Sequence, residues 1–162
     1  MQAAHLSVSF DLNGRRVSEP IAPTALLANV LREKFGIASV RTGCNEGVCG
    51  SCSVLIDGRT MRSCLMLAIQ ADGTSITTAE GYAAQPRLKR IQTAFVDGFG
   101  AQCGFCTSGM MAVVAEYLDD PAIADHRDAS TIRDALGAVV CRCTGYQQIV
   151  ALVSALAAED AA

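Results

Sequence analysis

Tryptophan is absent from the 162-residue sequence, and aromatic residues make up only 5% of it. Basic residues are also scarce, since 13 Lys and Arg stand against 16 Asp and Glu, a formal net charge of −3. Nucleic-acid-binding domains carry a basic footprint and membrane-surface segments a polybasic cluster, so neither kind of partner is expected. Hydrophobic residues still reach 51%, which is enough for the core of one domain or of two small ones.

Long apolar runs are missing as well. No stretch approaches the roughly 18 apolar residues of a membrane-spanning helix, so we expect no membrane insertion. The N-terminus, Met1-Gln2-Ala3-Ala4-His5, lacks the charged and apolar regions of a signal peptide, and we therefore expect a cytoplasmic protein. Without a secretory signal, the eight cysteines favour metal ligands over disulfides.

The sequence motifs of several common enzyme classes are lacking. The two histidines, His5 and His126, are isolated, and we interpret both as surface residues. No Ser/His/Asp set, G-x-G-x-x-G or P-loop is present. A hydrolytic triad, a dinucleotide-binding fingerprint and a nucleotide-binding phosphate loop are thereby excluded.

The clearest motif that is present runs from Gly43 to Cys52 and reads GCNEGVCGSC. Cys44, Cys49 and Cys52 have the spacing C-x4-C-x2-C, and Cys64 follows after eleven intervening residues. This is the plant-type [2Fe–2S] ferredoxin pattern, in which four thiolates hold two bridged irons. The glycines allow the backbone to wrap closely and to point its N–H groups at the sulfurs. A zinc knot or a disulfide loop is the alternative, but structural zinc sites usually present two C-x2–4-C pairs.

The residues around this motif predict a small α+β domain that spans residues 1–80. Alternating apolar residues on either side of Asn13-Gly14 indicate a β-hairpin over residues 5–19. Thr24 is the expected N-cap of a helix that ends at Gly36. The remaining strands are expected at residues 53–56, after the Asp57-Gly58 turn toward Cys64, and at residues 76–77.

The second half of the chain has a helical pattern. Residues 81–86 are the expected linker, and residues 87–162 the expected helical domain, with Pro86 opening its first helix. Ser130 is the expected N-cap of the third helix. The basic residues Arg87, Lys89 and Arg90 are interpreted as a solvated helix face, with a docking patch for an acidic partner as the alternative.

The other four cysteines lie in a degenerate internal repeat of this helical half. Each copy reads helix, cysteine pair, Thr, Gly, helix, so two helical hairpins related by a pseudo-twofold would bring four thiolates together at two helix N-termini. Thr107 or Thr144 is a candidate cap for those helices. The spacings C-x2-C and C-x-C leave a second iron–sulfur cluster and a zinc site both open. The four thiolates are those of Cys103, Cys106, Cys141 and Cys143.

Three motifs together resemble a known family. Gly43 to Cys52, the segment QCGFCT at residues 102–107 and the segment CRCTGY at residues 141–146 look like the iron–sulfur subunit of the molybdenum hydroxylases, which include xanthine dehydrogenase, aldehyde oxidoreductase and aerobic carbon monoxide dehydrogenase. The resemblance covers nearly the whole chain and uses all eight cysteines. One departure is Ser108, where the family commonly has Pro, and we expect no change of function from it.

The resemblance implies a β-grasp plant-type ferredoxin domain followed by an all-α four-helix domain of pseudo-twofold symmetry, each holding a [2Fe–2S] cluster. It also implies a large subunit with a molybdopterin cofactor and a medium subunit with FAD, in a heterotrimer or a dimer of heterotrimers. The chain length suggests a stand-alone subunit rather than part of a fused one. Electrons would pass from molybdenum through the helical-domain cluster and then the ferredoxin-domain cluster to FAD. The residues matching Gln102 and Cys143 lie against the pterin in that family, and no catalytic residue is expected in this chain.

The alternative function is a free-standing two-cluster ferredoxin, a diffusing electron carrier. Such a carrier needs its clusters near a solvated, charged surface. We expect the helical-domain site to be buried, which favours the subunit.

Overall fold

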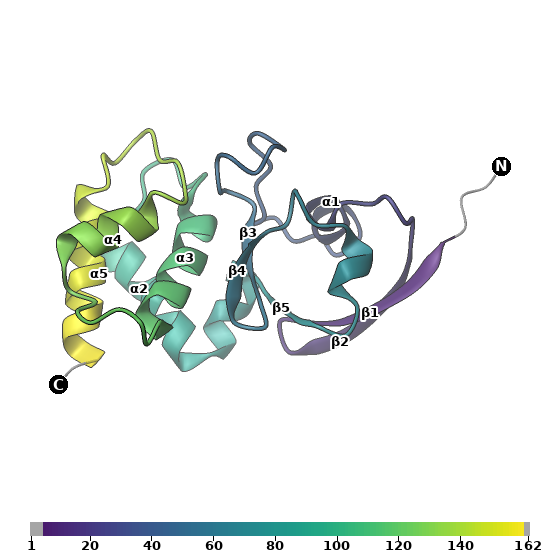
Figure 1. Cartoon of the computed structure of the whole chain (residues 1–162), viewed down its shortest axis with the longest axis horizontal. Coiled ribbons are helices and arrows are strands. Elements are labelled where there is room, and N and C mark those ends of the chain that lie inside the picture. The colour runs from purple at the N-terminus through teal and green to yellow at the C-terminus, as the bar shows by residue number, and fades with distance from the viewer. Residues whose placement is uncertain (1–4, 161–162) are drawn as a thin grey trace.

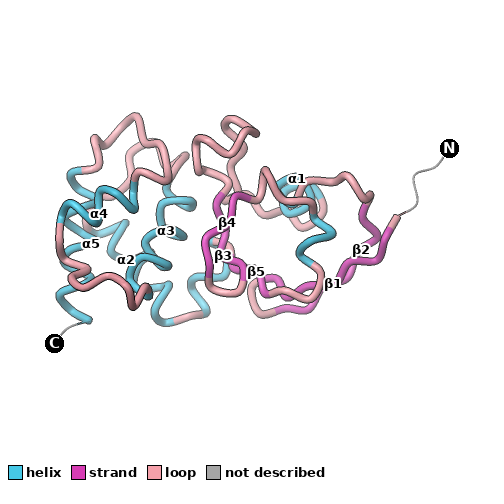
Figure 2. The backbone as a smooth tube through the Cα atoms, viewed as in Figure 1, coloured by secondary structure: helices cyan, strands magenta, loops and turns pink. Residues whose placement is uncertain are grey.

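The computed structural model describes residues 5–160, and within them strands and helices are segregated along the long axis of the molecule (Figures 1 and 2). The N-terminal part carries the strands and one short α-helix, and the C-terminal part carries the longer α-helices. The elements are β1 (Leu6–Leu12), β2 (Arg15–Ile21), α1 (Leu27–Glu33), β3 (Ser53–Ile56), β4 (Arg59–Arg62), η1 (Ala68–Ala71), β5 (Ser75–Thr77), η2 (Ala79–Ala84), α2 (Pro86–Asp97), α3 (Thr107–Asp119), α4 (Ala129–Leu136) and α5 (Gln147–Asp160). An α+β fold is confirmed.

The strands form a five-stranded mixed sheet with the order β2-β1-β5-β3-β4. Strand β1 pairs parallel with β5, and the other pairs are antiparallel. The predicted hairpin is confirmed, because Asn13 and Gly14 both have the positive φ of a tight two-residue turn. Along β1 the alternate residues Val8, Phe10 and Leu12 are buried, and they share a core with the apolar face of α1.

Strand β3 joins the two parts of the molecule, because both of its faces are buried. Val54 and Ile56 belong to the core beneath α1, whereas Leu55 points the other way, into the core of the helical part. Strand β4 adds polar contacts to the same junction. The hydroxyl of Thr60 donates to the carbonyl oxygen of Ala112 in α3 at 3.1 Å. The sheet is therefore covered by α1 on one face and by α3 beside its β3–β4 end (Figure 1).

Helices α2 to α5 pack around a second core, in which Met110 and Ile149 are fully buried. Two arginines of the basic segment in α2 make ion pairs within the chain. Arg87 pairs with Asp119 of α3 at 2.7 Å, and Arg90 pairs with Asp160 of α5 at 2.5 Å. These contacts favour the solvated helix face over a docking patch. Within residues 5–160, no helix has both the length and the apolar character needed to cross a membrane.

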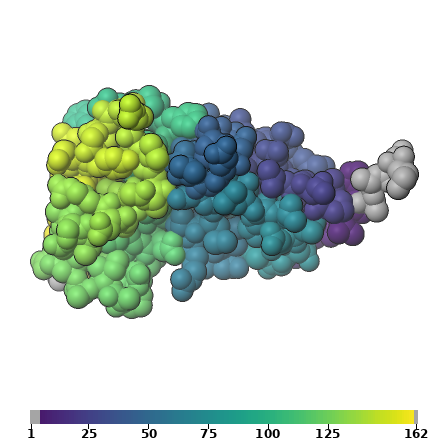
Figure 3. Space-filling model, turned by 45° about the horizontal axis from the view of Figure 1, so that its top comes forward, coloured from purple at the N-terminus to yellow at the C-terminus, as the bar shows by residue number. Residues whose placement is uncertain are grey.

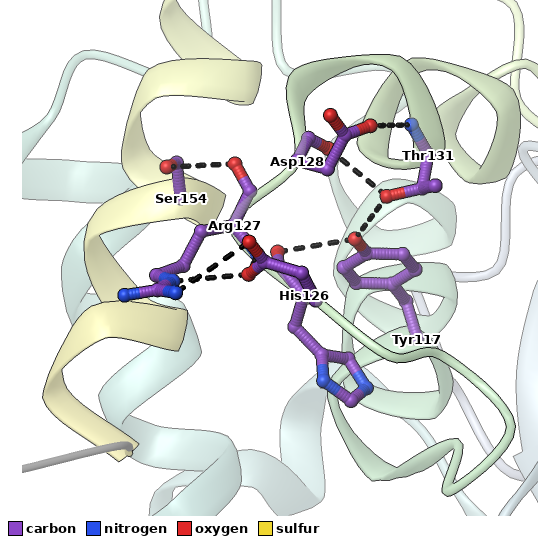
Figure 4. Close-up of polar contacts among 7 residues, drawn as sticks. Tyr117, His126, Arg127, Asp128, Thr131 and Ser154 are labelled. Carbon is purple, nitrogen blue, oxygen red and sulfur yellow. Dashed lines mark hydrogen bonds and ion pairs between the residues drawn. The ribbon is translucent and has the colours of Figure 1, made fainter.

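The connection between α3 and α4 is fixed by polar contacts (Figure 4). The hydroxyl of Tyr117 lies 3.0 Å from the carbonyl oxygen of His126 and 2.9 Å from the hydroxyl of Thr131. The hydroxyl of Ser154 in α5 donates to the carbonyl oxygen of Arg127 at 3.2 Å. The connection is thus attached to α3, α4 and α5, which holds the two helical hairpins together.

Three predicted helix caps are wrong. Helix α1 begins after Leu26, whose extended backbone pairs with Leu67, so Thr24 lies too far upstream to cap it. Asp128 rather than Ser130 caps α4, because its carboxylate accepts from the backbone N–H groups of residues 130 and 131. Thr107 is the first residue of α3 and not its cap, and no side chain caps that helix.

The segment expected as a linker contains regular structure. Most of residues 81–86 belong to the 3₁₀ helix η2, and Pro86 opens α2 as predicted. Tyr82 in this segment is 1% exposed and belongs to the core of the helical part. The division into domains at residues 1–80 and 87–162 stays a prediction.

Candidate metal centres

The first cysteine motif lies on the irregular loop between α1 and β3, which projects beside the helical part (Figure 1). The thiol sulfur of Cys44 accepts hydrogen bonds from the backbone N–H groups of Cys49 at 3.3 Å and Glu46 at 3.4 Å. These donors lower the pKa of Cys44 to about 7. The loop therefore stabilises a thiolate at this position with its own backbone.

Two glycines of this loop lie tightly against neighbouring side chains. A Cβ at Gly43 would lie 3.2 Å from the sulfur of Cys49 and 3.2 Å from the ring of Phe105. A Cβ at Gly47, whose φ is +75°, would collide with the side chain of Leu65. The expectation that these glycines allow close wrapping around the sulfurs agrees with this geometry.

The β3–β4 hairpin brings the other two cysteines of the first quartet together. Ser53 pairs with Arg62 in the antiparallel ladder, and Cys52, one residue before Ser53, lies within hydrogen-bonding range of Cys64, two residues after Arg62. The hydroxyl of Ser63 donates to the carbonyl oxygen of Cys52 at 2.7 Å and closes the hairpin. Both cysteines are buried, and this burial raises the pKa of Cys52 to about 11.

The second quartet lies where the two helical hairpins meet. Cys103 and Cys106 occupy the α2–α3 turn, and Cys141 and Cys143 occupy the α4–α5 turn. The sulfur of Cys143 is 3.5 Å from that of Cys103, and the thiol of Cys106 is within hydrogen-bonding range of Cys141. The predicted repeat therefore brings the four cysteines together in space.

The four thiols of this second quartet have different environments. Burial raises the pKa of Cys106 to about 12, whereas the backbone N–H of Phe105 lowers that of Cys103. Burial alone would raise the pKa of Cys141, but the hydroxyl of Thr144, 3.2 Å from its sulfur, and nearby backbone N–H groups lower it overall. Cys103 and Cys143 are exposed. The expectation of a buried helical-domain site is therefore wrong for two of its four cysteines.

All eight cysteines are free thiols, and they approach one another in pairs rather than in tetrahedral groups. A structural zinc ion needs four ligands around one point, whereas four thiolates around two bridged irons divide into two per iron. The paired donor sets therefore fit a two-iron cluster better than a zinc ion.

The two quartets are linked through the backbone. The N–H of Val140, next to Cys141, donates to the carbonyl oxygen of Cys49 at 2.9 Å. Gly50 lies against the backbone of Ala138 so closely that a Cβ there would collide with its carbonyl oxygen. In Figure 3, blue atoms of the N-terminal part lie against yellow-green atoms of the C-terminal part. The two cysteine loops thus lie side by side.

Three residues of this region were not identified by the sequence reasoning. Val140 and Phe105 neighbour cysteines in the sequence, but their contacts with the other cysteine loop depend on how the two parts pack. Arg62 donates to both cysteine loops. The only sequence signal for this role is that Arg62 lies two residues before Cys64. Gln102, which the family resemblance implies lies against the pterin, is exposed beside Cys103.

Two protein-family models match the chain, one over each quartet. Residues 17–90 match a "2Fe-2S iron-sulfur cluster binding domain", and residues 78–154 match a "[2Fe-2S] binding domain". The chain thus has two [2Fe–2S]-binding domains.

Full-length relatives agree with these matches. The chain is 41% identical to the 6-hydroxypseudooxynicotine dehydrogenase complex subunit beta of Paenarthrobacter nicotinovorans, over 93% of this chain and 91% of that protein. It is 39% identical to the xanthine dehydrogenase iron-sulfur-binding subunit of Escherichia coli O157:H7, over 90% of each. The crystal structure of quinoline 2-oxidoreductase from Pseudomonas putida 86 matches with a TM-score of 0.85 and 39% identity, over 98% of this chain and 96% of that chain.

The chain belongs to the family of iron–sulfur subunits of molybdenum hydroxylases. The resemblance found in the sequence is thereby confirmed, as is its expectation of two [2Fe–2S] clusters. As a member of this family, the chain is part of an oxidoreductase.

Proposed function

We propose that this chain conducts electrons from the molybdopterin site of a large subunit to the FAD of a medium subunit, using its helical-domain cluster first and its ferredoxin-domain cluster second. The complex would be a cytoplasmic heterotrimer or a dimer of heterotrimers. The observation that carries the proposal is the direct backbone contact between the two cysteine quartets, the 2.9 Å hydrogen bond from Val140 to Cys49. This contact supports the proposal because it holds the two proposed redox sites next to each other within one chain.

In this proposal the eight cysteines are the metal ligands. Cys44, Cys49, Cys52 and Cys64 hold one cluster, and the second quartet, defined above, holds the other. A bound [2Fe–2S] cluster accepts and releases one electron at a time. The chain supplies the thiolates, the backbone N–H groups that donate to the sulfur of Cys44, and the burial that keeps water from Cys52 and Cys64.

The exposed end of the helical-domain quartet is the proposed contact with the molybdopterin cofactor. Gln102 and Cys143 are both exposed, and Cys143 lies 3.5 Å from Cys103, the residue that follows Gln102. The amide of Gln102 offers a donor and an acceptor, which suits the amino and ring-nitrogen edge of a pterin. Cys143 would approach the same pterin while remaining a cluster ligand.

Exposed apolar side chains beside the cysteines support a subunit rather than a free carrier. Phe105 and Val140 flank cysteines of the helical-domain quartet, and Val48 and Leu65 flank cysteines of the ferredoxin-domain quartet. All four are exposed, and Phe99, just upstream of Cys103, is 79% exposed. Apolar surface gathered at a functional site is typical of an interface with another protein. A diffusing carrier would instead present charged groups there.

The test is purification of the full-length chain with an affinity tag from cells that express its native complex. We expect it to elute in size-exclusion chromatography with two larger chains, molybdenum, FAD and about four irons per copy. Elution as a monomer that still holds two clusters would favour the free-standing carrier. Stoichiometric zinc in place of iron would refute both functions.

A further inference from the structure

The side chain of Arg62 connects the segments that carry the two cysteine quartets. Its Nε donates to the carbonyl oxygen of Gly47, within the ferredoxin cysteine loop, at 2.8 Å. One terminal nitrogen donates to the hydroxyl of Ser53, next to Cys52, at 2.8 Å. The other donates to the carbonyl oxygen of Ala138, in the segment leading to Cys141, at 2.5 Å. One guanidinium thus contacts three segments of the chain, each within three residues of a proposed ligand.

The contacts of Arg62 surround the direct link between the quartets. Ala138 is two residues before Val140, whose N–H donates to the carbonyl oxygen of Cys49. Gly47 is two residues before Cys49 on the other side of this bond. By holding Gly47 and Ala138 at the same time, the rigid fork of Arg62 fixes the register in which Cys49 and Val140 meet. A flexible ammonium group could not hold both in the same geometry.

The positive charge of Arg62 makes no ion pair with a carboxylate in the described part of the chain. All three of its acceptors are uncharged, and no ion pair involves it among residues 5–160. The side chain is half-buried, which limits screening by solvent. A fixed positive charge beside a cluster favours the reduced form, because reduction adds one negative charge.

We propose that Arg62 is a positioning residue for electron transfer between the two clusters, holding the Cys49–Val140 contact in place and favouring reduction of the ferredoxin-domain cluster by its charge. This inference rests on the proposed function. In the step concerned, the chain passes one electron from the reduced helical-domain cluster to the oxidised ferredoxin-domain cluster, and no bond is formed or broken and no proton moves.

The test compares Arg62→Gln and Arg62→Lys with the unmodified full-length chain, each purified with its clusters. The matched control is Arg59→Gln, which removes an exposed positive charge from the first residue of the same strand. The readouts are iron content, the reduction potential of each cluster, and the magnetic interaction between the two reduced clusters in electron paramagnetic resonance. None of these readouts requires a partner subunit, so failure of this inference and failure of the proposed function are distinguishable.

We expect Arg62→Gln to shift the potential of the ferredoxin-domain cluster to more negative values and to weaken the magnetic interaction. Arg62→Lys should retain the potential, because the charge remains, but should also weaken the interaction, because the fork is lost. Arg59→Gln should change neither. If both Arg62 variants bind four irons and match Arg59→Gln in potential and interaction, Arg62 has only a structural role and the proposal is overturned.

A second variant covers the case in which the Arg62 variants lose iron. Ser53→Ala removes one of the three hydrogen bonds and leaves the charge in place. It should weaken the magnetic interaction by less than Arg62→Lys and leave both potentials unchanged. An unchanged interaction in Ser53→Ala, together with iron loss in both Arg62 variants, would equally overturn the positioning role.

Discussion

The hydroxyl of Ser108 donates to the carbonyl oxygen of Ser39 at 2.5 Å and so ties the first turn of α3 to the segment that leads into the ferredoxin cysteine loop. Ser39 in turn donates through its N–H and its hydroxyl to the carboxylate of Glu80, at 2.9 and 2.5 Å. Ser108 is the position at which the family commonly has Pro, and a proline cannot make this bond. The departure therefore adds a connection between the two parts of the molecule.

Ser108→Ala should lower the free energy of unfolding of the cluster-loaded chain by about 1 kcal/mol, the typical net contribution of one hydrogen bond. Ser108→Pro should be close to neutral, because proline is tolerated in the first helical turn and restricts the unfolded chain. Denaturant unfolding under anaerobic conditions measures both. The control is Ser7→Ala, at an exposed serine whose hydroxyl only meets Ser18 at 3.4 Å, and it should show no change. Equal stability of Ser108→Ala and Ser7→Ala would contradict the connection.

Glu80 should make the stability of the chain dependent on pH. Partial burial alone would raise the pKa of Glu80, but the donors from Ser39 and the hydroxyl of Thr78 lower it overall. A carboxyl whose pKa is lowered by folding stabilises the native state above its ordinary pKa of about 4.3, and this stabilisation is lost as the pH falls through the lowered value.

Glu80→Gln should therefore unfold at a lower denaturant concentration than the unmodified chain at pH 7, and this difference should shrink as the pH falls below about 5. Denaturant unfolding curves of both proteins at several pH values between 7 and 4 measure this difference. Any loss of clusters in acid is common to both proteins, so comparing them at each pH cancels that effect. A difference that stays constant over this range would show that the charge of Glu80 plays no part.

Much of the fold could be predicted from local sequence signals. The Asn13-Gly14 turn, the strand at residues 53–56 and the start of α2 at Pro86 were all expected and are present. The caps at Thr24 and Ser130 were wrong, because a nearby competing interaction decides each helix start: the pairing of Leu26 with Leu67, and the stronger acceptor of Asp128. These competitors cannot be ranked from the sequence alone.

The cysteine quartets were identified by spacing, but the contacts between them were not. Leu55 follows the alternation of β3, yet its burial among helices depends on how α3 packs against the sheet. The hydrogen bond from Val140 to Cys49 joins backbone groups 91 positions apart, and backbone groups leave no residue-type signal. Arg62 resembles an ordinary strand-end arginine until Gly47 and Ala138 are placed on either side of it. Tertiary packing, rather than motif, supplies the link between the two sites.

Cys49→Ala should remove the ferredoxin-domain cluster and leave the helical-domain cluster in place. The two quartets use separate ligands, and each part of the molecule has its own buried core. The iron content should fall from about four to about two per chain, and one of two signals should remain in electron paramagnetic resonance of the reduced protein. Loss of both signals in a chain that remains folded would show that the two sites do not assemble independently.

Gln102→Ala should retain both clusters but lower the molybdenum cofactor content of the purified complex, or slow reduction of the clusters by substrate. Gln102 is not a metal ligand, and its exposed position beside Cys103 leaves its amide free to reach a partner. Loss of one hydrogen bond to a buried partner costs roughly 1–3 kcal/mol, enough to misplace a bound pterin without unfolding the helices. The control is Gln148→Ala, at an exposed glutamine in the first turn of α5. Metal analysis and stopped-flow reduction by substrate compare the two variants. If Gln102→Ala matches Gln148→Ala in molybdenum content and in reduction rate, the Gln102 amide has only a local structural role and the proposed pterin contact is refuted.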